Sequence, residues 1–232
     1  MPANKYKLIV HEQAKSPVAE AYRTLRTNIQ FSRLDAELKT IVFSSAGPEE
    51  GKSTTLANTA VALANTGKKV IIVDCDLRKP VQHKIFGKKN RGLTNCLVEN
   101  VPLADLLQDT EIGNLYLLTS GPIPPNPSEL LGSKAMQDAL AYLKSEADYV
   151  LIDTPPAIAV TDVCVLASRV DGVVLVLNAG VVRPEMAQKA KELLLRANAR
   201  ILGVVLNQVE IEEEHAYYYY YYGHEKKHHA AK

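Results

Sequence analysis

Six short apolar runs, separated by stretches with helical character, constrain the fold of this chain more than any other feature. The runs are nearly continuous rather than alternating, which is typical of strands covered by helices on both faces. They span residues 40–44, 70–73, 115–118, 149–152, 172–177 and 201–206. Helical patterns fit residues 16–29, 53–66, 133–146, 161–168 and 184–198. The sequence therefore predicts an α/β fold with a doubly wound, mostly parallel sheet, in which ligands sit at the carboxyl ends of the strands.

Size and composition favour one domain that works in a reducing compartment. The chain has 232 residues, enough for one sizeable α/β domain, and its net charge of +1 gives no reason to expect a nucleic-acid partner. Its cysteines, Cys75, Cys96 and Cys164, are too widely spaced for a zinc site or a disulfide framework. No stretch approaches the roughly 20 apolar residues of a spanning helix, so we expect a cytoplasmic protein that reaches a membrane only through a partner.

Three parts of the chain are expected to differ in character. Residues 1–39 would form an N-terminal extension that carries the helix at 16–29, and residues 40–209 would form the nucleotide-binding core. Proline-rich residues 121–127 should be a stiff loop within that core. Residues 210–232 should form a flexible C-terminal tail, because they follow the last apolar run and are strongly polar.

A phosphate-binding loop follows the first apolar run. Residues 46–54 read Ala-Gly-Pro-Glu-Glu-Gly-Lys-Ser-Thr, the spacing of that loop with Ala46 in the place of the usual first glycine. Backbone N–H groups and the positive end of the following helix would converge on phosphates there, which a structural glycine turn would not require. Lys52 would reach the terminal phosphates, and the Ser53 hydroxyl would bind magnesium. The expected nucleotide-binding residues are Gly47, Pro48, Glu49, Glu50, Gly51, Lys52, Ser53 and Thr54.

Acidic residues end two further predicted strands, at Asp74, Asp76 and Asp153. In a parallel sheet these carboxylates emerge at the same edge as the phosphate loop. Magnesium on a nucleotide takes one or two carboxylates together with a hydroxyl and phosphate oxygens, which predicts a metal site of Ser53, Asp76 and Asp153. Asp74 is then a candidate to accept the proton of an attacking hydroxyl or to orient that hydroxyl. One such aspartate alone would more often be a helix or turn cap.

The tail contains six consecutive tyrosines, preceded by an acidic segment. A buried strand of this composition would need a hydrogen-bond partner for every enclosed phenol, so the run should be solvated. Composition alone favours a low-complexity tail without chemistry. Beside a phosphate site, however, exposed tyrosines suggest a kinase that phosphorylates its own tail. The candidate acceptors are Tyr217, Tyr218, Tyr219, Tyr220, Tyr221 and Tyr222.

Taken together, these motifs resemble the bacterial tyrosine kinases, the cytoplasmic kinases associated with capsular and exopolysaccharide synthesis. The resemblance extends from about residue 16 to residue 222: residues 46–54 look like the family's first Walker motif, 70–80 like its second and 149–156 like its Walker B motif. It implies a P-loop NTPase architecture like that of the MinD and ParA proteins. It also implies a protein-tyrosine kinase that uses ATP and Mg²⁺ and phosphorylates its tyrosine tail in trans, with Lys52, Asp74, Asp76 and Asp153 as catalytic residues.

The resemblance further implies an assembly and partners. Glu20, Arg23 and Arg26 look like the family's oligomerisation motif, which would build a ring, by resemblance an octamer, although pairing within one helix is the simpler interpretation. A transmembrane polysaccharide co-polymerase would hold the kinase at the inner face of the membrane and activate it, so the isolated chain should be weakly active. A protein-tyrosine phosphatase is a further expected partner. The output would be regulation of capsular or exopolysaccharide synthesis or export.

Several alternatives remain open from the sequence. A MinD- or ParA-like ATPase switch without kinase activity would use the same sheet, although such ATPases usually carry a signature lysine where this chain has Gly47. A pseudoenzyme that binds nucleotide only to organise other proteins is a third class. Asn207 would either contact adenine or cap a strand end. Arg78 and Lys79 receive no catalytic role, and Thr154 and Asp162 are candidate switch residues.

Overall fold

The computed structural model describes residues 6–32 and 38–209, which form a seven-stranded sheet between two layers of helices. The strand order is β3-β4-β2-β5-β1-β6-β7, and neighbouring strands are parallel except for the antiparallel edge pair β3 and β4. The strands are β1 (Thr40–Ser45), β2 (Val70–Asp74), β3 (Gln108–Asp109), β4 (Leu115–Leu118), β5 (Tyr149–Asp153), β6 (Gly172–Asn178) and β7 (Ile201–Asn207). The predicted doubly wound, mostly parallel sheet is confirmed.

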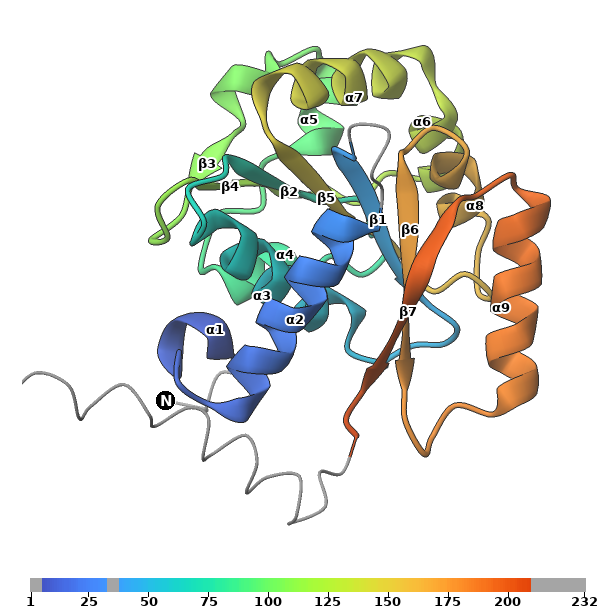
Figure 1. Cartoon of the computed structure of the whole chain (residues 1–232). Coiled ribbons are helices and arrows are strands. Elements are labelled where there is room, and N and C mark those ends of the chain that lie inside the picture. The colour runs from blue at the N-terminus through green and yellow to red at the C-terminus, as the bar shows by residue number, and fades with distance from the viewer. Residues whose placement is uncertain (1–5, 33–37, 210–232) are drawn as a thin grey trace, which may run out of the picture.

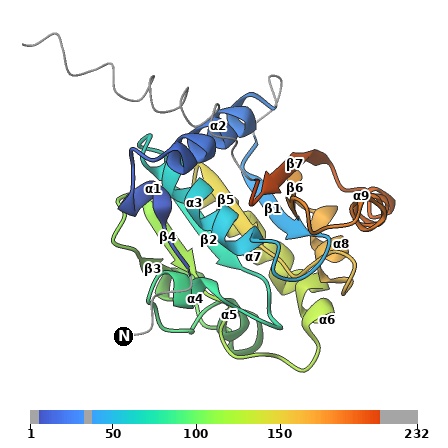
Figure 2. The same ribbon diagram turned by 90° about the horizontal axis from the view of Figure 1, so that it is seen from below.

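Helices cover both faces of this sheet (Figure 1). The α-helices are α1 (Ile9–Glu12), α2 (Pro17–Phe31), α3 (Lys52–Ala64), α4 (Gln82–Ile85), α5 (Leu93–Glu99), α6 (Pro127–Gly132), α7 (Lys134–Glu146), α8 (Asp162–Ala167) and α9 (Pro184–Arg196), with one 3₁₀ turn, η1 (Leu103–Asp105). Side-chain caps begin two of them: the Ser16 hydroxyl accepts Ala19 N at 3.1 Å, and the Ser133 hydroxyl accepts Met136 N at 3.1 Å. Helices α1, α2 and α3 lie on one side of the strands, opposite α5 and α6 (Figure 2).

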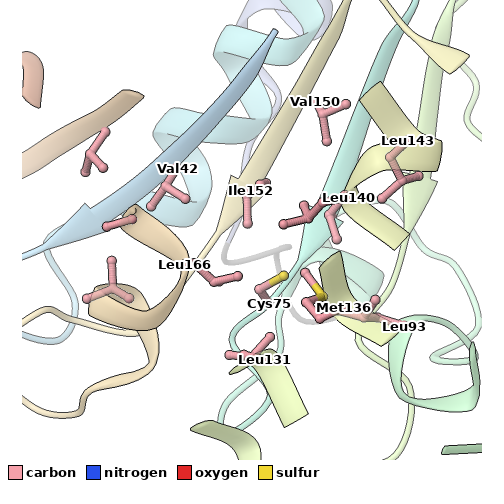
Figure 3. Close-up of a cluster of buried hydrophobic side chains, with 14 of the residues drawn as sticks. Val42, Cys75, Leu93, Leu131, Met136, Leu140, Leu143, Val150, Ile152 and Leu166 are labelled. Carbon is pink, nitrogen blue, oxygen red and sulfur yellow. The ribbon is translucent and has the colours of Figure 1, made fainter. Parts of the chain in front are cut away.

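Each face of the sheet packs into its own apolar core because alternate residues of every central strand point to opposite sides. Ile41 and Phe43 of β1 face the core beneath α1 to α3, whereas Val42 between them faces the core beneath α5 to α9. In the second core, Val150 and Ile152 of β5 lie with residues of α7 (Figure 3). Burial on both faces explains why the sequence shows continuous apolar runs.

Short elements differ most from the sequence-based expectation. The stiff loop predicted at 121–127 ends one residue early, because Pro127 occupies the first turn of α6, where a missing N–H costs nothing. Helices α1, α4, α5 and α6, the 3₁₀ turn η1 and the two-residue strand β3 were not predicted. The tail at residues 210–232, with its tyrosine run, lies outside the described residues. No helix among residues 6–32 and 38–209 is long and apolar enough to cross a membrane.

Candidate active site

The phosphate loop connects β1 to α3 at the carboxyl edge of the sheet. Gly51 caps α3 with φ of 85°, a left-handed conformation that glycine adopts without strain. A Cβ at this position would also lie 2.0 Å from Asn207 Nδ2, so a side chain is excluded by contact as well as by conformation. The 13-residue helix α3 therefore directs its N-terminal N–H groups and its positive dipole end into the loop.

Two side chains brace this loop from within. The buried carboxylate of Glu50 accepts a hydrogen bond from Gly47 N, and burial raises the pKa of Glu50 against the opposing effect of that bond. Asn207, the last residue of β7, donates from Nδ2 to the Glu50 carbonyl oxygen at 3.0 Å. This geometry favours the strand-end interpretation of Asn207, since its amide is already bonded to the loop. A contact with the base stays a prediction.

The ammonium group of Lys52 lies at the centre of the acidic edge. Its Nζ is 3.1 Å from Asp76 Oδ2, 3.3 Å from Asp153 Oδ1 and 3.1 Å from Ser53 Oγ. Burial opposes the lysine charge, but the carboxylates of Asp153 and Asp76 outweigh burial and raise the pKa of Lys52. The structure thus brings together the four side chains predicted to hold phosphate and metal, although they come from α3, the loop after β2 and the end of β5.

Strand register explains this convergence. Asp74 of β2 pairs directly with Asp153 of β5, so the acidic ends of the two strands are level with each other. The same end of β5 pairs with Phe43 of β1, two residues before the phosphate loop begins to leave the sheet. Three neighbouring parallel strands therefore deliver their polar termini to one place, as expected for a nucleotide site of this fold.

The donor set suits magnesium held partly by a nucleotide. Two carboxylates and a hydroxyl surround one positive charge at hydrogen-bond distance, and all are hard oxygen ligands. Among the described residues, no group of three or more His, Cys, Asp or Glu side chains is placed to hold a metal ion. Phosphate oxygens would complete the shell in this kind of site, so Ser53, Asp76 and Asp153 fit a metal that arrives with its nucleotide.

Asp74 is enclosed beneath the loop that follows β2. Its side chain is fully buried, and its oxygens accept hydrogen bonds from the backbone N–H groups of Asp76 at 3.2 Å, Val81 at 3.0 Å and Gln82 at 2.9 Å. Burial, with the nearby charge of Asp153, raises the pKa of Asp74 to about 8. In this conformation Asp74 holds the loop in place. The predicted proton transfer to Asp74 requires the loop to open.

Gln82 is a functional candidate that sequence reasoning missed. It is fully buried, and its Nε2 donates to Asp153 Oδ2 at 2.8 Å and to the Ser53 carbonyl oxygen at 3.2 Å. Through these bonds it orients both the Asp153 carboxylate and the start of α3. A polar residue shortly after Pro80 was the only sequence signal, and a buried amide has no characteristic spacing from the carboxylate that it orients.

The candidate switch residues have structural partners. The Nε and Nη2 atoms of Arg78 each donate to the buried Asp162 carboxylate at 3.0 Å, and that carboxylate also accepts a hydrogen bond from Ser128. The Thr154 hydroxyl donates to the Phe43 carbonyl oxygen at 2.9 Å and is fully buried. These bonds tie the Asp76 loop to α6 and α8, and β5 to β1. A switching role for Thr154 or Asp162 stays a prediction.

On α2, the predicted interface residues do not share one environment. Glu20 and Arg23 form the intrahelical ion pair, with side-chain exposures of 51% and 29%. Arg26 instead turns toward α3, where its NH1 donates to the Ala62 carbonyl oxygen at 3.4 Å. The interface at these three residues therefore stays a prediction, and the simpler pairing of Glu20 with Arg23 is present.

Comparison with known proteins places this geometry in a family. Residues 37–232 match the ParA family model, which is described as an NUBPL iron-transfer P-loop NTPase. The tyrosine-protein kinase YwqD of Bacillus subtilis is 46% identical over 86% of this chain and 85% of its own length. The putative tyrosine-protein kinase CapB of Staphylococcus aureus is 41% identical over 89% of this chain and 91% of its own. The chain belongs to the bacterial tyrosine kinases, within the ParA-type P-loop NTPases.

A solved structure agrees with this assignment. The crystal structure of the chimerical protein CapA2B2 superposes with a TM-score of 0.84 at 45% identity, covering 88% of this chain and 90% of that one. The prediction of a protein-tyrosine kinase with a P-loop architecture is thereby confirmed. For this bacterial tyrosine kinase, the iron-transfer description is a property of the wider family model, since YwqD and CapB are both named as tyrosine-protein kinases.

Proposed function

We propose that this kinase transfers the γ-phosphoryl group of ATP, in the presence of Mg²⁺, to the tyrosine run of a neighbouring copy and thereby regulates capsular or exopolysaccharide synthesis or export. The observation that carries the proposal is the position of Lys52 within 3.1–3.3 Å of Ser53, Asp76 and Asp153 at the carboxyl edge of the sheet. The polysaccharide role rests on the motif resemblance, and the kinase reaction rests on the site and the family.

Bound Mg-ATP supplies the transferable phosphoryl group and a metal charge that offsets the charge of the phosphates. With nucleotide bound, Lys52 would contact the phosphates, and Asp76, Asp153 and Ser53 would hold the metal. As the phenol oxygen bonds to the γ-phosphorus, the bond between that phosphorus and the bridging oxygen of ATP breaks and ADP leaves. The phenol proton passes to Asp74 once the loop that covers Asp74 opens. Because the phosphoryl group carries most of the charge, positioning and electrostatics account for most of the catalysis.

The assembly proposal extends this chemistry to several chains. Glu20, Arg23 and Arg26 would contact a neighbouring subunit and close a ring, an octamer by resemblance, in which each tail reaches the next active site. A transmembrane co-polymerase would recruit the kinase to the inner face of the membrane, and its cytoplasmic segment would stabilise the competent site. A protein-tyrosine phosphatase would reset the tail. Equal phosphorylation rates with and without the co-polymerase segment would contradict the activation step.

One sample of the full chain treated with ATP and magnesium tests both the reaction and the switch. Mass spectrometry should find several phosphates within residues 217–222, the tyrosine run. Each phosphate adds about −1.5 to −2 charges beside an acidic segment, so light scattering should show rings dissociating toward monomers. A tyrosine run without phosphate would refute autophosphorylation. Phosphorylation with unchanged particle mass would refute only the switch.

A further inference from the structure

A groove of about 500 Å³ runs alongside the nucleotide site and has a basic wall and an apolar wall. The basic wall is formed by the loop after β2 and the start of α4, including Arg78, Lys79 and Lys84. Pro122 and Ile123 line the groove on the other side, and Ile123 is 64% exposed. Lys79 and Val81 also line the cavity of about 680 Å³ at the phosphate loop. The groove therefore leads into the site of phosphoryl transfer.

Charge in this region is strongly one-sided although the whole chain is nearly neutral. Residues 78–91 contain six lysine and arginine residues and no aspartate or glutamate, whereas the net charge of the chain is +1. Arg78 is neutralised by Asp162, but within the described chain Lys79 and Lys84 form no ion pair. The basic wall thus retains the unpaired charges of Lys79 and Lys84.

The groove is held rigid by Asn90, which joins its two walls. Asn90 Nδ2 donates to the Gly121 carbonyl oxygen at 2.9 Å, and Asn90 Oδ1 accepts Gly121 N at 3.0 Å. Gly121 has φ of +81°, and a Cβ there would lie 2.3 Å from Thr94 Oγ1, so the turn requires glycine. A fixed groove binds an extended segment without first losing its own conformational freedom.

We propose that this groove is the docking site for the acidic segment, residues 210–214, of a second copy of the chain, and that it selects tyrosines preceded by glutamates. The inference rests on the proposed function and names a specificity determinant for it. The acidic segment reads Glu-Ile-Glu-Glu-Glu, and the first tyrosine follows its last glutamate by three residues. Three residues span at most about 10–11 Å, so glutamates on the basic wall place the first phenols toward the nucleotide cavity.

Both walls match the chemistry of this occupant. Glutamates pair with the free ammonium groups of Lys79 and Lys84, and aromatic rings cover the exposed surface of Ile123 and Pro122. Phosphorylation changes the tyrosines, and each added phosphate increases the negative charge near Asp74, Asp76 and Asp153. The glutamates are not changed by the reaction. A segment docked through its glutamates can therefore present successive tyrosines to the same active site.

Synthetic peptides test this specificity with the full chain as the kinase. The acidic probe carries residues 209–223, and the neutral probe carries Gln at Glu210, Glu212, Glu213 and Glu214. Because exposed ion pairs each contribute about 0.2–1 kcal/mol, we expect KM for the neutral probe to be about 5–10 times higher at low salt, with kcat unchanged within about twofold. Raising the salt to about 0.5 M should remove most of that difference, since screening shortens the range of the attraction.

Charge reversal in the groove sharpens the test. Lys84→Glu should raise KM for the acidic probe about 3–5-fold and leave KM for the neutral probe unchanged, because a single exposed charge is involved. A third probe with Glu212→Lys and Glu213→Lys should regain affinity for the Lys84→Glu kinase. Lys189→Glu, an equal change at an exposed position on α9, is the matched control and should alter none of these values.

The outcomes separate this inference from the proposed function. If both probes are phosphorylated by the unaltered kinase with equal KM, or if the Lys84→Glu loss is the same for acidic and neutral probes, the groove does not read the glutamates. If neither probe accepts phosphate at any concentration, the proposed transfer to the tail fails, and the groove loses its function with it. Rescue of Lys84→Glu by the lysine probe is an outcome that misfolding does not produce.

Discussion

Aspartates at the two ends of the central sheet have pKa values shifted in opposite directions: the pKa is raised for Asp74 at the carboxyl end and lowered for Asp171 at the amino end. At the carboxyl end, Asp74, Asp76 and Asp153 share a single ammonium group, that of Lys52, and the pKa of Asp74 is raised to about 8 by burial and by Asp153. At the amino end, Asp171 accepts the backbone N–H groups of Lys39 at 3.0 Å and Thr40 at 2.9 Å, and Lys144 Nζ at 2.9 Å.

The pKa of Asp171 is lowered because hydrogen-bond donors surround its carboxylate. Burial opposes ionisation there as well, but the hydrogen bonds from Lys144 and from the backbone of Thr40 and Lys39 lower its pKa to about 2. Asp171 is a satisfied structural anion that fastens β1 to β6. At the carboxyl end, by contrast, three carboxylates surround Lys52, which is the imbalance expected of a site that is proposed to take up a metal ion.

The largest expected effect comes from removing Lys52, whose ammonium group lies between Asp76 and Asp153 at the carboxyl end. Lys52→Met should lower tyrosine phosphorylation by about 10²–10³-fold, because Lys52 stabilises charge on the transferred group. It should also abolish the rise in melting temperature that ATP and magnesium produce in a thermal-shift titration. Lys191→Met, at an exposed position on α9, is the matched control. An unchanged ligand-induced shift in Lys52→Met would count against the site.

The second prediction applies the same chemical change to both ends. Asp153→Asn should lower kcat by about 10–100-fold, since a predicted metal-side carboxylate is lost. The free energy of unfolding without nucleotide should stay about equal, because the lost ion pair with Lys52 is offset by the lost repulsion with Asp74. Asp171→Asn should leave kcat within about twofold. Denaturant unfolding and steady-state kinetics on both variants measure the contrast. A similar loss of stability in Asp153→Asn and Asp171→Asn would contradict the proposed electrostatic difference between the two ends of the sheet.

A smaller effect is expected at Gln82, which supports the carboxyl end without touching the reactants. Gln82→Met should lower kcat about tenfold and stability by about 1 kcal/mol, because Asp153 loses the donor that orients it. Gln82→Glu keeps the shape but brings another anion toward Asp153, so it should be more damaging than Gln82→Met at pH 8. Equal activities of the two variants at that pH would remove the orienting role.

The smallest effect on activity, and a defined effect on stability, is expected at Asp171. Its folded pKa of about 2 lies below the ordinary value of 3.8, so its contribution to stability is present above about pH 4 and is lost as pH falls through about 2. Asp171→Asn should cost about 1–2 kcal/mol at pH 7 through weakened charged hydrogen bonds. The difference between the variant and the unaltered chain, followed by acid titration of denaturant midpoints, should shrink below pH 4. A constant difference would contradict the pKa shift.

The sequence was sufficient to predict the strands that are buried on both faces, because such strands appear as continuous apolar runs. Strands β1, β2, β5 and β6 are enclosed on both faces and therefore appear as continuous apolar runs, and their predicted bounds are close to those observed. Strand β3 has two residues, and α4 has four, which is too short for any periodicity to develop. Pro127 was ambiguous because proline occurs both in loops and at the start of helices.

For the site, residue types were predictable and mutual geometry was not. The motif spacing singled out Lys52, Ser53, Asp76 and Asp153, and the fold brings them together. The enclosure of Asp74 and the role of Gln82 depend on how the loop after β2 folds back over the strand ends, which no local pattern specifies. The inward turn of Glu50 likewise depends on the left-handed residues Glu49 and Gly51.

The hydrogen bond between Asn207 and the phosphate loop fixes the point from which the reach of the tail to a neighbouring subunit is measured. The tail leaves the domain from a residue pinned to its own active site, and Tyr217 follows that residue by ten positions. Ten residues span at most about 33–36 Å, so the backbone of Tyr217 never travels farther than that from Asn207 of its own chain. If a neighbouring subunit receives Tyr217, the distance from Asn207 to the phosphate loop of that subunit can exceed this limit only by the length of the tyrosine side chain. For Tyr222, five residues farther along, the limit is larger by about 17–18 Å. Subunit spacing is thus limited by tether length as firmly as by any interface.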